Sequence, residues 1–275
     1  MNIIEAIILG IVQGLTEFLP VSSTAHLTVA GKLLGLVSDS RPEEWTAFIA
    51  VIQLGTLAAV LIYFARDIRE ILLSFFRENL QRIPLARQSH NSRMGWYVII
   101  GTLPIVIAGL GLKKVIEGHL TKDATVIGTS LIVLAVILFV AERSARFARG
   151  VNDVTLKDAI LIGAAQACAL IPGSSRSGTT ITAGLFAGLT REAAARFSFL
   201  LSIPAVLASG LLELKQVIPY IDSHQAVSMT VAAVTSGLVG YASIAFLLRY
   251  LKSHTVLPFV VYRIILGVLL LLFMR

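Results

Sequence analysis

Cysteine and charge are both scarce in this chain of 275 residues. Cys168 is the one cysteine, which excludes an internal disulfide and a metal site built from several cysteines. Charged residues make up 14% of the chain, whereas a soluble domain carries about 25%. Hydrophobic residues make up 56%, and the mean hydropathy is +0.84. This composition excludes an ordinary soluble domain and indicates an integral membrane protein.

The first residues also lack the features of a cleaved signal peptide. They contain no basic region, Glu5 interrupts the first apolar stretch, and no small-x-small cleavage site follows. We therefore expect the first segment to remain in the mature protein. The net charge of +7 comes from basic residues that cluster between apolar segments. Anionic lipid headgroups and membrane topology explain these residues better than nucleic acid does.

Six stretches of the chain predict membrane-spanning helices, since about 20 apolar residues cross a bilayer. Each stretch has no charged residue, apart from Arg263 in the last one. The six stretches are Thr46–Ala65, Met94–Leu112, Ala124–Ala141, Phe197–Leu212, Gln225–Leu248 and Thr255–Met274. The predicted fold class is therefore an all-α polytopic membrane protein.

Two further apolar stretches, Asn2–Gly31 and Ala159–Thr190, are interrupted near their middles. The interruptions are Pro20–Ser23 and Pro172–Ser175, which combine proline with serines. A stretch of about 30 residues that breaks at its centre predicts two half-helices that enter the membrane and turn back. Irregular backbone at that depth is tolerated inside protein or beside a wet cavity. We therefore expect two re-entrant helical hairpins beside a polar site.

The two broken stretches resemble each other in sequence. Ala6–Gln13 aligns with Ala159–Gln166, and the proline-serine breaks then align with a gap of one residue. Each half of the chain predicts one hairpin followed by three spans. Because three is odd, the second half is expected to enter the membrane from the opposite side, as an inverted repeat. We expect one integral membrane domain over 1–275, with repeats at about 1–141 and 157–275.

Lysine and arginine are unevenly distributed in this arrangement. With both termini outside, fourteen of the 23 basic residues lie on the inner side and seven on the outer side. The other two, Arg176 and Arg263, lie within apolar segments. Inner loops of membrane proteins carry an excess of lysine and arginine. The bias therefore predicts that both termini lie outside.

Glu17 lies within the first broken stretch, where an unpaired carboxylate is costly. Gln13 lies one helical turn before it on the same face. Hydroxyl and imidazole groups follow at Ser22, Ser23, Thr24 and His26. Structural roles are open to each residue alone: serines after proline commonly cap a helix, a buried glutamate can be a hydrogen-bonding group, and a histidine can extend to the membrane interface.

Arg176 stands among hydroxyl groups where the second half-helix should begin. Backbone N–H groups at a helix start, glycines that admit a ligand and a guanidinium fork together suit a phosphate. The Lys-Ser/Thr ending and the preceding strand of a Walker loop are missing. The candidate phosphate-binding residues are Gly173, Ser174, Ser175, Arg176, Ser177, Gly178 and Thr180.

Two arginines also have structural interpretations. Arg176 could simply neutralise Glu17, although such a pair would still mark a polar site at the membrane midplane. Arg263, next to Tyr262 in the last span, is expected to pair with a carbonyl or a lipid phosphate rather than to act. Taken together, a carboxylate, an imidazole and an arginine fall at the two breaks, which the repeat brings together. This coincidence favours one shared functional site.

Four segments match the motifs of a known family. They are Gln13–Glu17 as Glu/Gln-x-x-x-Glu, Ser22–His26 as Ser-Ser-Thr-x-His, Pro172–Thr180 as Pro-Gly-x-Ser-Arg-Ser-x-x-Thr, and Pro258–Arg263. With these motifs the chain resembles, over nearly its whole length, the undecaprenyl-diphosphatase (bacitracin-resistance) family of bacterial membrane phosphatases. Many members have Glu where this chain has Gln13. That difference leaves one acidic ligand and puts a two-carboxylate metal site in doubt.

The resemblance implies hydrolysis of undecaprenyl diphosphate to undecaprenyl phosphate and inorganic phosphate, which recycles the carrier lipid of cell-wall polymers and confers bacitracin resistance. It also implies a divalent cation, Mg²⁺ or Ca²⁺, which we expect at Glu17 and Gln13. We expect Ser23 to be the nucleophile, Glu17 or His26 its base, and Arg176 the group that holds the terminal phosphate. Attack by an activated water stays open. The substrate-binding residues expected at the first break are Gln13, Ser22 and Thr24.

The expected partners are the polyprenyl diphosphate lipid, membrane lipids and a second copy of the chain in a homodimer, with no nucleic acid. The expected location is the bacterial cytoplasmic (inner) membrane, with the active site facing the periplasmic or extracellular side. An ion-coupled transporter or flippase of a polyprenyl phosphate lipid is the alternative function, since it would share the broken helices. A purely structural membrane subunit would leave Glu17 and Arg176 unexplained.

Overall fold

The computed structural model describes residues 1–37, 42–111, 123–217 and 223–274. Over these ranges the chain is helical, and its one β-type contact is an isolated bridge between Arg149 and Leu189. The predicted all-α class is therefore confirmed. Leu112, the end of one predicted span, lies outside the described residues, and so do five of the counted basic residues: Arg41, Lys113, Lys114, Lys122 and Arg275.

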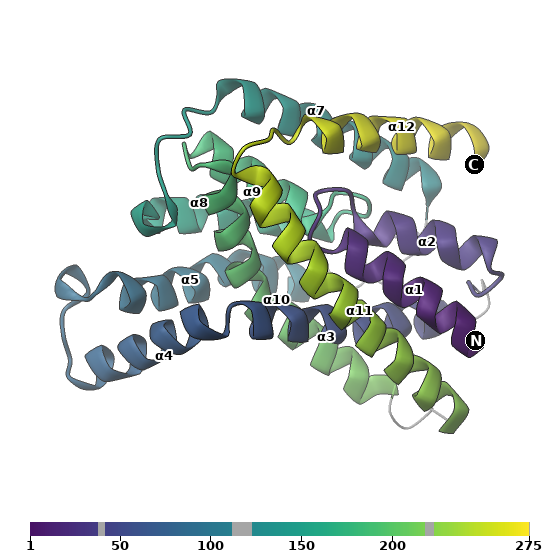
Figure 1. The fold of residues 1–275 in the computed structure, drawn as a ribbon, viewed down its shortest axis with the longest axis horizontal. Helices are drawn as coiled ribbons and strands as arrows, with labels where there is room; N and C mark the ends of the chain where they lie inside the picture. Colours follow the sequence, from purple (N-terminus) through teal and green to yellow (C-terminus); the bar gives the residue numbers. More distant parts are fainter. Residues whose placement is uncertain (38–41, 112–122, 218–222, 275) are drawn as a thin grey trace.

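The helices follow one another through two halves of the chain (Figure 1). The first half contains α1 (Ile3–Thr16), α2 (Ser23–Leu33), α3 (Pro42–Tyr63), α4 (Ala65–Leu80), α5 (His90–Gly111) and α7 (Ala124–Ser144). The second half contains α8 (Leu156–Ala167), α9 (Arg176–Phe186), α10 (Arg191–Val217), α11 (Ser223–Leu251) and α12 (Leu257–Phe273).

Four of the described helices, α5, α7, α10 and α11, are long and apolar enough to cross a membrane. A fifth span results if α3 and α4, which meet at a bend of 76°, are taken as one. The chain is therefore a multi-pass membrane protein. The predicted count of six spans stays a prediction, because α12 has 17 residues and falls short of a full crossing.

Helix α4 was missed in the sequence, where its arginines were assigned to an inner loop. Its charged residues break up any long apolar run, but leucine and phenylalanine recur on one face. Leu72, Leu73 and Phe76 are all more than 45% exposed. A helix of this kind, bent away from the preceding span, is typical of an element that lies along the membrane surface.

The two broken segments are built alike at a constant spacing of 153 residues. Helices α1 and α8 begin at 3 and 156, and helices α2 and α9 begin at 23 and 176 and end at 33 and 186. Asn2 and Thr155 both form capping boxes, and Gly35 and Gly188 both have positive φ. The predicted repeat of the broken segments is thus present, but its one-residue gap is wrong. Aligning Pro20 with Pro172 is misleading, because in the structure Pro20 corresponds to Gly173.

Each break ends in a serine with unusual backbone geometry. Ser22 and Ser175 are the N-caps of α2 and α9, with φ values of 74° and 67°. Positive φ is uncommon for residues other than glycine and costs free energy. Each serine hydroxyl accepts a hydrogen bond from the N–H three residues later, at Ala25 and Gly178. The caps hold the two breaks in matching conformations.

Small residues let helices from distant parts of the sequence approach closely. Helix α11 packs against both α1 and α3, and α7 lies beside α12 (Figure 1). At Gly55 of α3 an added Cβ would lie 1.9 Å from the carbonyl oxygen of Ala233 in α11. At Gly163 of α8 it would lie 2.2 Å from the carbonyl oxygen of Gly101 in α5. Such contacts are typical of helix packing in membranes.

The termini and the basic loops lie at opposite ends of the molecule. In Figure 1 the N- and C-termini lie at one end, and the connections from α4 to α5 and from α7 to α8 lie at the other. Arg82 and Arg87 lie in the first of these connections, and Arg146 and Arg149 in the second. The arrangement agrees with the uneven distribution of basic residues along the sequence.

Gly55→Ala should lower the free energy of unfolding by about 3 kcal/mol, because the methyl group overlaps the α11 backbone and overpacking is costly. Gly109→Ala is the matched control, since an added Cβ there meets no described atom within 4 Å. Its effect should be neutral or slightly stabilising, because alanine favours a helix more than glycine does. Thermal unfolding in detergent measures both, and equal midpoints would contradict the packing of α3 on α11.

Candidate active site

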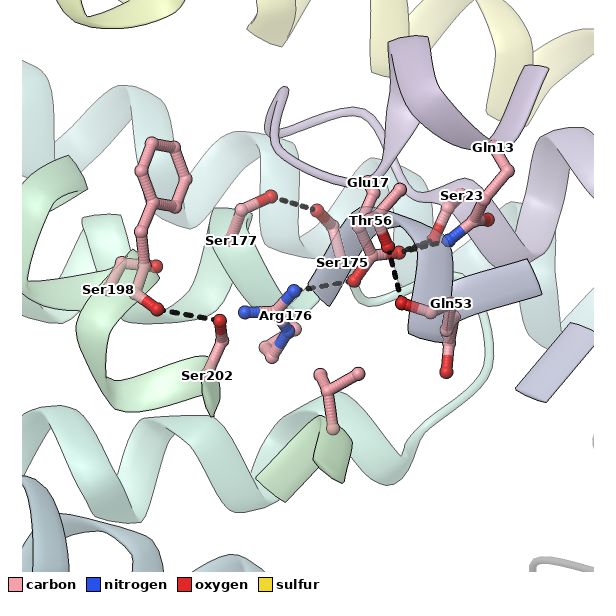
Figure 2. A network of polar contacts seen from close by, with 12 residues as sticks. Gln13, Glu17, Ser23, Gln53, Thr56, Ser175, Arg176, Ser177, Ser198 and Ser202 are labelled. Carbon is pink, nitrogen blue, oxygen red and sulfur yellow. Dashed lines mark hydrogen bonds and ion pairs between the residues drawn. The ribbon is translucent and has the colours of Figure 1, made fainter. Parts of the chain in front are cut away.

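A buried ion pair joins the two breaks. Glu17 follows the last residue of α1, and Arg176 is the first residue of α9, 159 positions later. Arg176 Nη2 donates to Glu17 Oε1 at 2.5 Å (Figure 2). The two side chains are 12% and 5% exposed. The structure therefore confirms that the breaks meet and that Arg176 pairs with Glu17.

The second carboxylate oxygen of Glu17 accepts two more hydrogen bonds. Gln13 Nε2 donates to Oε2 at 3.0 Å, and Ser23 Oγ donates to the same oxygen at 2.8 Å (Figure 2). Gln13 reaches Glu17 because residues four apart share a helix face. Three donors therefore satisfy the oxygens of this buried carboxylate.

Aromatic packing fixes the end of α1 beside this network. Phe18, the next residue after Glu17, is 1% exposed and packs edge to face against Phe199 of α10, with ring centroids 5.2 Å apart. Phe64 packs against the same Phe199 ring at 6.3 Å. These rings pack the first break against α10 and the junction of α3 and α4, so that Glu17 is held in place by the core.

Several polar atoms at the site are buried without a hydrogen-bond partner. They include Arg176 Nη1 and Gln13 Oε1, which flank Glu17, and Ser174 Oγ in the second break. Buried polar atoms in folded proteins are nearly always paired, so each exception requires an explanation. A cationic donor and an amide oxygen left free beside Glu17 are what an anionic ligand and its counter-ion would use.

Helices α3 and α10 supply the opposite wall. Glu17, Arg176, Thr56 of α3 and Ser202 of α10 line a crevice that has no room for a water molecule. Thr56 donates to the carbonyl of Gln53, which lies beside Ser23 and Glu17 in Figure 2. Ligand pockets usually measure about 300–1,000 Å³, so a lipid diphosphate requires these walls to separate.

The hydroxyl groups of the second break also hold the fold together. Ser177 Oγ donates to the carbonyl of Leu19 at 2.9 Å, which ties α9 to the first break. Thr180 Oγ1 lies 2.6 Å from Ser198 Oγ in α10. Ser175 caps α9 and lies 3.2 Å from Ser177 Oγ. In the first break Ser22 caps α2, and the half-buried Thr24 follows in its first turn.

The two glycines expected to admit a ligand are in contact with protein. Gly173 has φ +82°, and an added Cβ would lie 2.5 Å from the Ile127 carbonyl oxygen and from Ser130 Oγ in α7. An added Cβ at Gly178 would lie 2.4 Å from Arg263 Nη1. Both glycines therefore allow the second break to approach its neighbours, α7 and α12.

His26 is turned away from Ser23 in this structure. Its Nδ1 lies 2.7 Å from the carbonyl oxygen of Ser22, and its Nε2 lies 2.5 Å from Tyr262 Oη. A carbonyl oxygen only accepts, so Nδ1 carries the hydrogen and Nε2 accepts from the tyrosine. Of the two bases expected for Ser23, the structure brings Glu17 into contact with it.

Four polar residues at the site were missed in the sequence: Gln53, Thr56, Ser202 and Tyr262. Gln53 and Ser202 end two apolar runs, Phe48–Gln53 and Phe197–Ser202, that follow the breaks in each half. A polar residue at the same place in both runs was the available signal. Tyr262 lies within the Pro258–Arg263 motif, but that motif assigned no contact or role to it.

Comparison with known proteins gives a consistent result. Residues 6–269 match the family model described as bacitracin resistance protein BacA. An undecaprenyl-diphosphatase of Syntrophobacter fumaroxidans is 58% identical over 268 residues, which cover 97% of this chain and 95% of that protein. Undecaprenyl-diphosphatases of Chloroherpeton thalassium and Myxococcus xanthus are 53% and 51% identical, covering 98% and 100% of this chain and 96% and 90% of those proteins.

Glu17→Gln and Arg176→Met should each lower the free energy of unfolding by about 3 kcal/mol or more, because each leaves a buried charge without its partner. The double variant should lose less than the sum of the two single losses. Unfolding midpoints in detergent measure this coupling. Asp67→Asn is the control: it removes the more exposed Asp67–Arg196 pair and should cost about 1 kcal/mol or less. Strictly additive losses at Glu17 and Arg176 would contradict the buried pair.

Proposed function

The chain belongs to the bacitracin resistance protein BacA family, and on that premise we propose that it hydrolyses undecaprenyl diphosphate to undecaprenyl phosphate and inorganic phosphate. This reaction recycles the carrier lipid of peptidoglycan and other cell-wall polymers and confers resistance to bacitracin. The observation that carries the proposal is the buried contact of Ser23, Glu17 and Arg176 across the two breaks. It combines a nucleophile, a base and a phosphate-binding cation.

Arg176 is the residue that would hold the terminal phosphate. Glu17 fixes its Nη2, while its Nη1 is buried without a partner and is free to donate to a phosphate oxygen. The guanidinium lies at the first turn of α9, where the N–H groups of the helix start favour an anion. These donors would also stabilise the charge that develops on the phosphoryl oxygens in the transition state.

Ser23 is the nucleophile that the geometry supports. Its hydroxyl already donates to Glu17 Oε2 at 2.8 Å, so Glu17 can take the proton as Oγ attacks the terminal phosphorus. The bond from that phosphorus to the bridging oxygen breaks, and undecaprenyl phosphate leaves. A water molecule then hydrolyses the phosphoserine, which releases inorganic phosphate and restores the Ser23 hydroxyl. A water activated by Glu17 is the alternative attacking group.

A divalent cation fits the oxygen atoms at the site. Gln13 Oε1 is buried without a partner beside the Glu17 carboxylate, and Mg²⁺ and Ca²⁺ prefer oxygen ligands. Mg²⁺ commonly uses one or two carboxylates together with substrate phosphates. Glu17 and Gln13 would hold the cation, which when bound would offset the negative charge of the diphosphate. The described residues include no cluster of three or more His, Cys, Asp or Glu, so the substrate phosphate would complete the set.

The location proposed is the bacterial cytoplasmic membrane, with the site open to the outer face and the lipid tail entering between helices. The bias of lysine and arginine toward the loops opposite the termini supports this orientation. A cysteine introduced at either terminus and labelled from the periplasm tests it. The homodimer expected from the sequence stays a prediction.

Ser23→Ala should reduce phosphate release from purified protein by about 1,000-fold or more, because it removes the group that attacks phosphorus. Wild-type protein given substrate labelled in its terminal phosphate should retain label on Ser23 after an acid quench. Ser92→Ala is the matched control, since it removes a serine hydroxyl away from the breaks. Ser92 lies in α5, and its buried hydroxyl donates to Gln88, just before that helix. Full activity of Ser23→Ala would favour attack by water, and no release from folded wild type would favour the transporter or flippase.

Gln13→Glu should lower the concentration of Mg²⁺ needed for half-maximal phosphate release by about tenfold, because a second carboxylate strengthens a hard-oxygen site. EDTA should abolish the release, and Mg²⁺ or Ca²⁺ should restore it. The rise in unfolding temperature with added Mg²⁺ measures binding without turnover. Gln88→Glu, at a buried glutamine distant from the breaks, should leave the Mg²⁺ dependence unchanged. If Gln13→Glu left the Mg²⁺ dependence of phosphate release unchanged, Gln13 would not be a ligand of the cation.

A further inference from the structure

Arg263 is buried in the middle of α12, among the largest side chains that are fully shielded from solvent. Its exposed fraction is 0%. A charged side chain in such a place is costly unless it is paired or has a function. The mechanism above does not use Arg263, and Glu17 already has Arg176 as its cationic partner.

The guanidinium of Arg263 contacts three carbonyl oxygens that lie far apart in the sequence. Nη2 donates to the carbonyl of Ser174 at 2.8 Å, while Nη1 and Nε lie 3.4 Å from the carbonyl oxygens of Pro20 and Leu131. The expectation that this arginine pairs with a carbonyl is therefore confirmed. Pairing with a lipid phosphate is excluded, because no part of the side chain is open to the membrane.

One of these carbonyls lies in each break, within two residues of its serine N-cap. Pro20 and Ser174 lie just before Ser22 and Ser175, the N-caps with positive φ. Irregular backbone leaves such carbonyls without a helical partner, and in a membrane they require another donor. The planar fork of an arginine can satisfy several carbonyls at once, whereas a lysine ammonium is a single point.

The Arg263 guanidinium is closely surrounded by protein atoms. A Cβ added at Gly178 would lie 2.4 Å from Arg263 Nη1, so any larger residue at position 178 would displace the fork. The neighbouring Tyr262 adds a contact from α12 to the first turn of α2, just after the first break, through His26 Nε2 at 2.5 Å. Helix α12 thus contacts both breaks, three residues along the chain from Glu17 and two from Arg176.

We propose that Arg263 is a positioning residue of the active site: by binding the carbonyls of Pro20 and Ser174 together, it holds the two breaks in the register that brings Ser23, Glu17 and Arg176 into contact. The proposal rests on the phosphatase function proposed above. Arg263 acts through the backbone of the breaks and does not itself touch the substrate. Misplacement of catalytic groups by about 1 Å can reduce a rate by about 100-fold.

The test compares Arg263→Met and Arg263→Lys with Arg191→Met in purified full-length protein. Arg191 is the matched control, because its guanidinium is partly buried against Glu142 away from the breaks. We expect kcat for phosphate release to fall by about 100-fold in Arg263→Met, less in Arg263→Lys, and less than twofold in Arg191→Met. KM should stay within about threefold of wild type in all three, because Arg263 does not bind the substrate.

Amide hydrogen exchange gives a second measurement that does not depend on activity. Within the breaks, the Val21 N–H donates to the Leu19 carbonyl and the Ser174 N–H donates to the Ile171 carbonyl. Peptides covering 17–22 and 171–175 should exchange faster in both Arg263 variants than in wild type. The same peptides should be unchanged in Arg191→Met, even if its unfolding temperature falls.

Three results would overturn the proposal. One is a folded Arg263→Met or Arg263→Lys variant with wild-type kcat. Another is a raised KM with kcat unchanged, which would make Arg263 a substrate ligand. The third is unchanged exchange at both breaks. Absence of phosphate release in wild type would instead refute the phosphatase function, and the exchange measurement would still decide whether Arg263 holds the breaks together.

Discussion

The ion pair between Glu17 and Arg176 is the interaction on which the rest of the site depends. Neither charge is stable alone in an apolar surrounding, so each break requires the other. The pair fixes one nitrogen of the arginine and leaves the second free, while Gln13 and Ser23 occupy the remaining carboxylate oxygen. The contact that joins the two breaks therefore also aligns the residues proposed as nucleophile, base and phosphate-binding group.

Because the breaks are shielded from water, their polar groups must form hydrogen bonds within the protein, and this requirement explains the contacts around the ion pair. A break in a membrane helix leaves N–H and carbonyl groups that need partners within the protein. Ser22 and Ser175 satisfy N–H groups as N-caps, and Arg263 satisfies carbonyls from both sides. Because these partners come from α2, α9 and α12, the three helices are held around one point. The residues proposed to take part in catalysis lie on irregular backbone, and these contacts would give them a rigid support.

Sequence patterns predicted much of this arrangement, and their failures have physical causes. Apolar runs predicted the helical class, and Pro-Ser interruptions predicted the two breaks. The alignment of the breaks by their prolines was wrong by one residue. The repeated feature is a serine N-cap with positive φ, and a positive φ at a serine cannot be predicted from the residue type. Helix α4 was missed because its apolar face is one side of a charged helix, and a search for uncharged runs overlooks it.

Composition and apolar runs were sufficient to determine that this is a multi-pass membrane protein and to single out Glu17 and Arg176 as candidate site residues, because burying ionisable groups in apolar runs is costly at any position in the fold. The tertiary structure alone decided which groups touch. It directs His26 to Tyr262 and Ser23 to Glu17, and it places Arg263 on the carbonyls of both breaks. Hydrogen bonds require distances of about 3 Å, and residues 159 or 243 positions apart reach such distances only through the packing of the helices between them.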